Sequence, residues 1–190
     1  MNYDDLIKKW HAKASEEDYF SKYVFEYLAF IATLRKKGFT QARNDRHAIQ
    51  LLKQNDHIKN LYLPQAASST TAAQAWQNIK DELDSAPLGN VSNAGQVEEI
   101  FYWNCSHSEL NQKTEEEKQK RSGILHDIED WENMVEFWHS IRNNFFHAGK
   151  DPEDRRDRLL VKNGFITLQL LVKMMIYDDQ VLVSTYWEKS

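Results

Sequence analysis

Several features that would narrow the function of this protein are scarce or missing in its sequence. Cys105 is the single cysteine, so no disulfide can form within the chain. The chain has only three prolines and six glycines, a composition that favours long helices over a sheet with many turns. Its formal net charge of −5 gives no overall attraction to nucleic acid or to an anionic membrane, so any contact with RNA must come from a local patch.

The sequence also lacks segments that would place it in a membrane. Its first ten residues, MNYDDLIKKW, have no apolar core of the kind found in signal peptides. No uninterrupted apolar run reaches the length needed to span a bilayer. We therefore expect a cytoplasmic protein that makes no membrane contact.

Aromatic residues, in contrast, are abundant, with six Trp, eight Tyr and nine Phe. Hydrophobic residues make up 41% of the chain and charged residues 28%, which is ordinary for a soluble globular protein. A length of 190 residues suits one domain. We expect residues 1–190 to fold as a single domain that carries one insertion.

Apolar residues recur at three- and four-residue spacing in several segments, which is the pattern of an amphipathic helix. Ser15 is expected to cap the helix that follows it, and Arg46 and Lys53 are expected to face solvent. Pro64 and its small polar neighbours predict a connection rather than a helix. The predicted helices cover 1–14, 16–37 and 42–55, then one capped by Thr70 or Thr71, a short one from Val97, an exposed one over 111–121, one from Trp131 to just before Gly149, and a last one from Pro152 to about Tyr177.

These segments predict an all-α fold, an antiparallel helical bundle. Two helix pairs, near 16–55 and 130–177, are expected to form its core, with 65–128 as an insertion of helices and loops packed beside them. The last helix is apolar nearly all round, so it is either central or also covers a partner. Gly164 inside that helix costs about 1 kcal/mol relative to Ala, so we expect it to allow close helix packing.

Polar residues gather at the end of the otherwise apolar helix that begins at Trp131. Arg142, Asn143, Asn144 and His147 stand there, and such groups are costly to bury without partners. Arginine offers a planar charged fork that suits phosphate, and histidine can move a proton near neutral pH. On a regular helix Arg142 and His147 diverge by roughly 140°, so they share one cleft only if the helix frays or kinks. Together they indicate phosphoryl chemistry on RNA.

The segment Arg142-Asn143-Asn144-Phe145-Phe146-His147 resembles the R-x(4–6)-H motif of HEPN domains (higher eukaryotes and prokaryotes nucleotide-binding). An aromatic helix precedes the motif and another long helix follows it, as in that family. The resemblance implies an HEPN-like helical bundle that forms a homodimer, so that two motifs face one another. It also implies a metal-independent endoribonuclease in a toxin–antitoxin or phage-defence setting, with an antitoxin or regulatory protein as a further partner.

Carried over to this chain, the family mechanism assigns a role to each motif residue. One His147 would take the proton from a ribose 2′-OH, and the His147 of the second copy would protonate the 5′-oxygen leaving group. Arg142 would stabilise charge on the phosphate, and Asn143 would orient the histidine or the phosphate. Asn144 and Lys150 are the expected substrate-binding residues. Neither a cofactor nor a metal is expected, because no ligand cluster accompanies the motif.

Two other interpretations of the same residues stay open. The domain could be a non-catalytic HEPN-like module that binds nucleotide, RNA or a partner protein, with the motif as a phosphate clamp. Alternatively, Arg142 could cap backbone carbonyls and pair with an acid, while His147 serves as a cation at the helix end.

Overall fold

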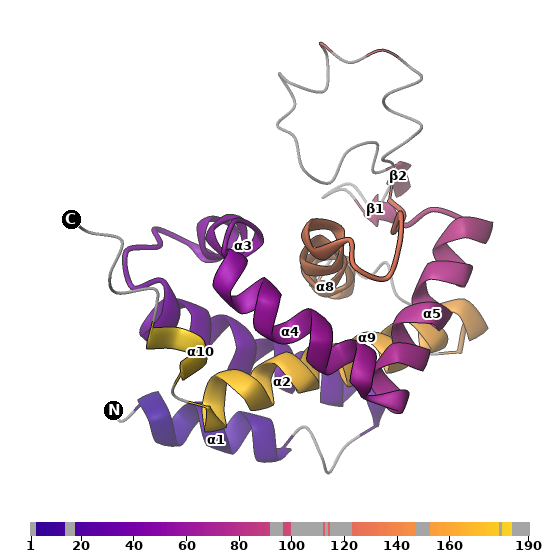
Figure 1. Cartoon of the computed structure of the whole chain (residues 1–190). Helices are drawn as coiled ribbons and strands as arrows, with labels where there is room; N and C mark the ends of the chain where they lie inside the picture. Colours follow the sequence, from indigo (N-terminus) through magenta and orange to yellow (C-terminus); the bar gives the residue numbers. More distant parts are fainter. Residues whose placement is uncertain are drawn as a thin grey trace.

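The computed structural model describes residues 3–13, 18–91, 97–99, 112, 114, 123–146, 153–178 and 180–183. Helices dominate this part of the chain, which confirms the predicted all-α bundle (Figure 1). The helices are α1 (Tyr3–Lys13), α2 (Tyr19–Thr33), α3 (Asp45–Lys53), α4 (Asp56–Ser68), α5 (Thr70–Ser85), α8 (Trp131–Phe146), α9 (Arg155–Tyr177) and α10 (Gln180–Val183), with a π-helical turn, η1 (Leu34–Gly38). Two short strands, β1 (Gly89–Val91) and β2 (Val97–Glu99), pair antiparallel with Gly89 opposite Glu99.

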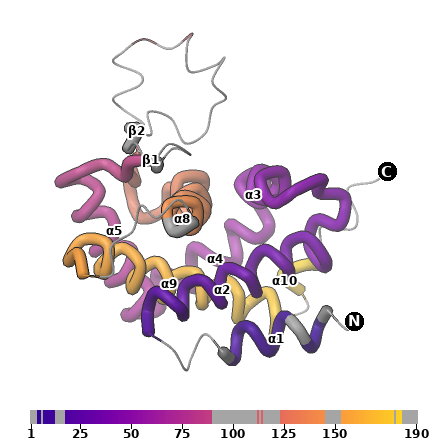
Figure 2. Tube along the Cα trace, turned by 180° about the vertical axis from the view of Figure 1, so that it is seen from behind, coloured from indigo at the N-terminus to yellow at the C-terminus, as the bar shows by residue number. Residues whose placement is uncertain are grey.

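Helix α9 is the central element of the bundle. It packs along α2 on one side and along α5 on the other. Figures 1 and 2 both show α8 nearly end-on, whereas α2 and α9 lie across the view. Helix α8 therefore runs across the layer that α2 and α9 form. By length and composition α9 could span a membrane, but 61% of its apolar window is buried inside the protein. Burial among α2, α5 and α8 accounts for that apolar character.

Aromatic side chains in the core join these helices. Their polar atoms form hydrogen bonds to other side chains and to backbone carbonyls. The indole of Trp76 donates to the Tyr62 hydroxyl at 2.9 Å, and that hydroxyl donates to the Thr167 carbonyl at 3.0 Å. The indole of Trp138 donates to the Thr167 hydroxyl at 3.0 Å, and the Tyr23 hydroxyl donates to the Trp138 carbonyl at 2.6 Å. Because a buried polar atom without a partner is costly, these bonds fix α8 against α2 and α9, and α4 against α5 and α9.

Gly164 lies where α9 meets both α2 and α8. A Cβ atom at this position would stand 3.1 Å from Tyr23 Cε2 and 3.2 Å from Phe137 Cε1. Both distances are shorter than ordinary carbon contacts. The prediction that Gly164 allows close helix packing is therefore confirmed.

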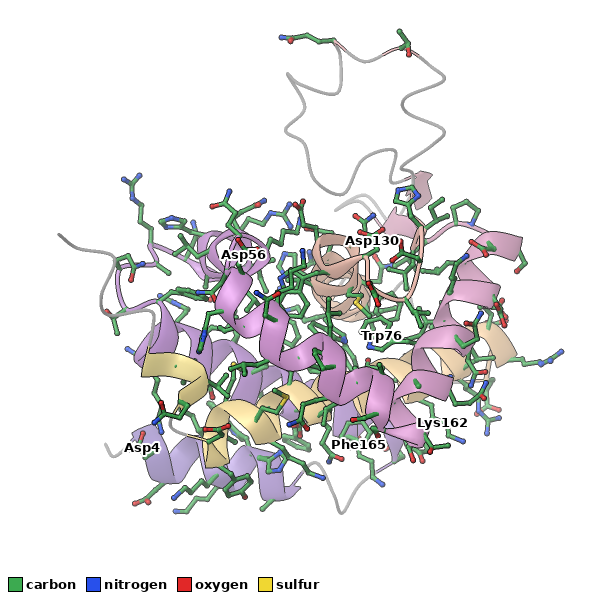
Figure 3. All side chains as sticks on the ribbon, in the orientation of Figure 1. Asp4, Asp56, Trp76, Asp130, Lys162 and Phe165 are labelled. Carbon is green, nitrogen blue, oxygen red and sulfur yellow. The ribbon has the colours of Figure 1, made fainter. Side chains whose placement is uncertain are left out.

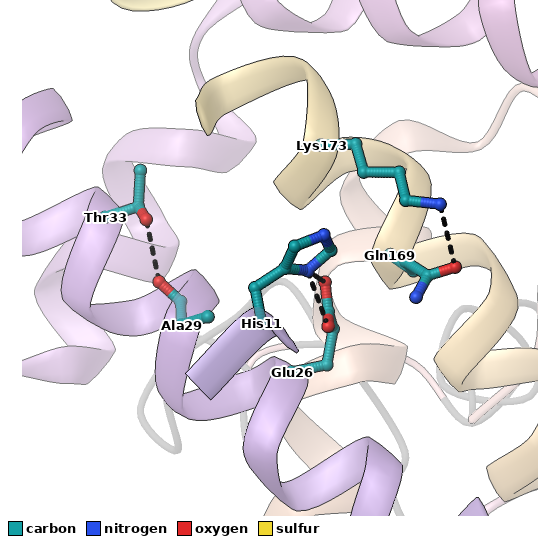
Figure 4. Close-up of polar contacts among 6 residues, drawn as sticks. All are labelled: His11, Glu26, Ala29, Thr33, Gln169 and Lys173. Atoms are coloured by element: carbon teal, nitrogen blue, oxygen red, sulfur yellow. Dashed lines mark hydrogen bonds and ion pairs between the residues drawn. The ribbon is translucent and has the colours of Figure 1, made fainter. Parts of the chain in front are cut away.

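Helix α1 is fastened to α2 by a buried polar pair. The Nδ1 atom of His11 lies 2.8 Å and 3.0 Å from the two carboxylate oxygens of Glu26 (Figure 4). Burial raises the pKa of Glu26, and the hydrogen bond and charge of His11 act in the opposite direction. The pair docks α1 on the bundle at a position where neither side chain could be buried alone.

The predicted beginning of α2 was wrong by a few residues. Asp18, rather than Ser15, is the N-cap, because its Oδ1 accepts the backbone N–H groups of Phe20 and Ser21. Ser15 lies outside the described residues. The prediction placed Asp18 inside the helix, but an aspartate with an extended backbone is one of the preferred caps.

Pro64 lies within a helix and not in the connection that was predicted for this segment. It stands inside α4, on the exposed side, while Ile58, Tyr62 and Ala66 are buried on the opposite face. An interior proline costs about 3 kcal/mol. Burial of Ile58 and Tyr62 stabilises the fold by a similar amount or more, so tertiary packing keeps the segment helical. The helix that follows is capped by Ser69 and not by Thr70 or Thr71.

Helix α5 falls in the range 65–128, which was predicted as an insertion packed beside the core. It contributes Trp76, Ile79 and Leu83 to the core against α9. The insertion itself stays a prediction. Val97, predicted to begin a short helix, belongs instead to β2. The predicted helix over 111–121 lies outside the described residues except for Gln112 and Thr114.

Candidate functional site

The candidate site is built on the polar stripe of α8. The helix begins at Trp131, as predicted, and core residues occupy one side of it. Glu136, His139 and Asn143 recur at three- and four-residue spacing, so they share one face. That face turns toward α3, which packs against α8, and toward Tyr27 of α2. Polar groups with this much burial need partners, and α2 and α3 supply them.

Arg142 lies half-buried beside this stripe. Its Nη1 donates to Asn143 Oδ1 at 3.0 Å, and its Cζ lies 5.7 Å from the centroid of the Tyr27 ring. It borders a pocket of about 40 Å³ together with Tyr27, Leu28 and Asp45. A cavity of this size holds only a few water-sized groups and cannot enclose a nucleotide. The guanidinium is thus held in a defined orientation at the rim of a small pocket between α2 and α8.

His139 is the histidine of α8, and it is almost fully buried, with 7% of its surface exposed. Its Nδ1 lies 2.8 Å from the Tyr27 hydroxyl. Burial lowers the pKa of His139 to about 4, and the charges of Arg46, Arg142 and Lys53 act in the same direction against the opposing effect of Glu136. Burial also raises the pKa of Tyr27. At neutral pH both partners of this hydrogen bond are therefore uncharged.

Glu136 anchors the stripe to α3 through two cations. Arg46 and Lys53 both form ion pairs with its carboxylate, whose side chain is 6% exposed. Lys53 is 5% exposed, so the prediction that it faces solvent was wrong, and Arg46 is only partly exposed. Burial lowers the pKa of Lys53, and the charge of Glu136 opposes that shift. Removing one member of such a buried group leaves an uncompensated charge, so the cluster holds α3 and α8 in register.

Asn144 connects the end of α8 to the hairpin. Its side-chain Nδ2 donates to the Gly89 carbonyl at 2.9 Å, and the residue is 2% exposed. This bond positions β1 beside α8, so Asn144 has a structural role. Its predicted contact with substrate stays a prediction.

Two of the five predicted site residues, His147 and Lys150, lie outside the described residues. Helix α8 ends at Phe146, directly before His147 in the sequence. The structure thus brings Arg142 and Asn143 together, whereas the shared cleft of Arg142 and His147 stays a prediction. Within the described ranges, no group of three or more His, Cys, Asp or Glu side chains is placed to hold a metal ion.

Sequence reasoning missed Tyr27, Glu136 and His139 as parts of this site. Tyr27 was assigned only to the apolar stripe of its helix, where most tyrosines are packing residues. Glu136 and His139 had a usable signal, because they precede Asn143 by seven and four residues and so prolong its face of the helix by two turns.

Fold and site define a helical bundle with a buried polar cluster that ends at a half-buried arginine. No protein-family model matches the chain, and comparison with the curated proteins and with the solved structures found no match.

Proposed function

We propose that this chain is a metal-independent endoribonuclease of the HEPN type, acting in a toxin–antitoxin or phage-defence setting. The observation that carries the proposal is the fixed position of Arg142 at the rim of a pocket, on the end of α8 that leads into His147. A guanidinium held in this way can bind two phosphate oxygens without first losing conformational freedom. The proposal therefore assigns Arg142 to the scissile phosphate.

In the proposed reaction, the 2′-OH of the RNA attacks the adjacent phosphorus, and the bond between phosphorus and the 5′-oxygen breaks. One His147 accepts the proton of the 2′-OH, and the His147 of a second copy donates a proton to the departing 5′-oxygen. Arg142 stabilises the charge that develops on the phosphate oxygens, and Asn143 orients the guanidinium. The products are a 2′,3′-cyclic phosphate and a 5′-hydroxyl. Asn144 and Lys150 complete the proposed substrate contacts.

The properties of His139 support the assignment of proton transfer to His147. Burial lowers the pKa of His139 to about 4, so this histidine is neutral at pH 7. Its side chain is also buried, beside the Tyr27 hydroxyl. His139 is thus a poor general acid, so the proposed mechanism needs the other histidine near the end of α8.

The proposal is tested by incubating the wild-type protein with total RNA in the presence of EDTA at pH 6–8. We expect cleavage that leaves 2′,3′-cyclic phosphate ends, and we expect DNA of matched sequence to survive because it has no 2′-OH. RNA that stays intact would exclude the ribonuclease. If Arg142→Ala then still lowers the affinity for RNA or nucleotide, relative to the exposed control Arg43→Ala, the domain is a binding module instead.

A further inference from the structure

A second and larger pocket opens where the beginning of α2 meets the first half of α9. Its volume is about 500 Å³, within the range of pockets that bind small organic ligands. Tyr19 and Lys22 of α2 line it, together with Arg158 and Lys162 of α9. Figure 3 labels Lys162, together with Phe165, on this half of α9. We call this site the Tyr19 pocket.

Two ammonium groups from different helices converge on one aromatic ring in the Tyr19 pocket. The Nζ atoms of Lys22 and Lys162 lie 5.1 Å and 5.5 Å from the centroid of the Tyr19 ring. Tyr19 is 38% exposed, and its ring meets Phe165 edge to face, with the centroids 6.1 Å apart. Cation–π attraction holds both lysines near the ring although their charges repel. An anion bound between them would relieve that repulsion.

The charges that line the Tyr19 pocket leave it positive. Lys22, Arg158 and Lys162 face two carboxylates, those of Asp18 and Glu153. Both oxygens of Asp18 are engaged in capping α2, since they accept the Phe20 and Ser21 backbone N–H groups and the Ser21 hydroxyl. On a chain with a net charge of −5, this is a local basic site.

Helix α2 connects this pocket to the candidate site. Tyr19 and Tyr27 are eight residues apart on α2, so they are separated by about 12 Å along its axis. Tyr23 and Tyr27 are buried, so other residues form the surface of α2 between the two sites. Among them, the partly exposed Val24 and Leu28 border the Arg142 pocket. Each end of this stretch of α2 holds positive charge, from Lys22 and Lys162 at one end and from Arg142 at the other.

We propose that the Tyr19 pocket binds a backbone phosphate of a single-stranded RNA whose next nucleotides extend along α2 toward Arg142. Lys22 and Lys162 form the clamp for the phosphate oxygens, Arg158 adds long-range attraction, and Tyr19 positions the two lysines. The identity of the strand as RNA rests on the proposed ribonuclease function, whereas the phosphate clamp rests on the lysines and the ring alone.

The test is the binding of a fluorescein-labelled 2′-O-methyl oligouridylate, followed by fluorescence anisotropy over a range of salt concentrations. This probe cannot be cleaved, so a chain without ribonuclease activity can still pass or fail the test. Each phosphate contact to a single strand contributes about 0.7 to the salt slope. The double variant Lys22→Gln/Lys162→Gln should therefore lower the slope by about 1.4 and weaken binding about 25-fold at 0.1 M salt.

Two comparisons separate the clamp from a general charge effect. The variant Lys9→Gln/Lys173→Gln removes the same charge from exposed positions elsewhere, and it should keep nearly all the affinity. Tyr19→Phe should bind like wild type because it retains the ring, whereas Tyr19→Ala should lose affinity. Circular dichroism confirms that each variant is folded.

Two results would overturn the proposal. Equal loss of affinity in the two lysine double variants would show that no clamp exists at Tyr19. Displacement of the oligonucleotide from wild type by millimolar inorganic phosphate, with no effect of chain length on affinity, would show that the pocket takes a free phosphate and not a strand.

Discussion

At the scale of single residues, the proposed site is formed mainly by polar side chains of α8. Asn143 and Tyr27 position Arg142, and Tyr27 also bonds to the buried His139. A half-buried arginine has already lost much of its side-chain freedom, so it can bind a phosphate at a smaller entropic cost than a fully solvated one. Tyr27 therefore links the residue that we assign to the phosphate with a histidine that is kept neutral.

The buried histidine makes a prediction about stability and pH. Because the pKa of His139 is about 4 in the folded protein and about 6.5 in the unfolded chain, the unfolded chain binds a proton in that window and the folded chain does not. The free energy of unfolding should fall as the pH is lowered from 6.5 to 4, by about 3 kcal/mol in total. Urea unfolding at a series of pH values measures this change.

The control for this prediction is a second histidine. His139→Gln should flatten the pH dependence in this window, whereas the exposed His126→Gln should keep it. An unchanged slope in His139→Gln would mean that another group titrates.

At the scale of elements, the sequence predicted the helices whose apolar stripes are long and failed where packing or a short segment decides. Helices α8 and α9 begin and end close to the predicted residues because their apolar periodicity extends over four turns or more. Pro64 misled the prediction because the burial of Tyr62 and Ile58, which offsets its cost, depends on distant helices. Strand β2 has three residues, too few for a periodic pattern.

The same reasoning explains how much of the site could be predicted. Arg142, Asn143 and Asn144 could be predicted as site residues because polar residues are unusual on an otherwise apolar helix. The burial of Lys53 could not be predicted, since it depends on Glu136, a residue 83 positions away in the sequence. Long-range pairing of this kind has no local signal.

Close packing at Gly164 provides a test at the scale of helices. Gly164→Ala should lower the free energy of unfolding by about 1 kcal/mol, although alanine is the better helix former, because the new methyl group crowds Tyr23 and Phe137. Lys173→Ala, at an exposed position on the same helix, should change stability by less than about 0.5 kcal/mol. Urea denaturation measures both. A more stable Gly164→Ala protein would show that the three helices have room to move apart.

At the scale of the whole molecule, the proposed mechanism requires two copies of the chain. One motif supplies one His147, and the reaction needs a proton acceptor and a proton donor. Phe137, Trp138 and Ile141 of α8 are buried in the core of the single chain, so they are not available for a contact between copies. A two-fold axis would place the Arg142 end of α8 close to its own copy.

Sedimentation at micromolar concentration tests this assembly. We expect the mass of two chains. A monomer that nevertheless cleaves RNA would contradict the composite site.

The most direct test of the central claim compares cleavage rates of matched variants on the same RNA in EDTA. Arg142→Ala and His147→Ala should each lose 10²- to 10⁴-fold in rate, about the contribution of a general acid–base or charge-stabilising group. Arg43→Ala and His126→Ala, which remove the same residue types from exposed positions, should cut like wild type and leave 2′,3′-cyclic phosphate ends. If folded Arg142→Ala and His147→Ala proteins cut RNA as fast as the two controls, the assignment of the active site to the end of α8 is wrong.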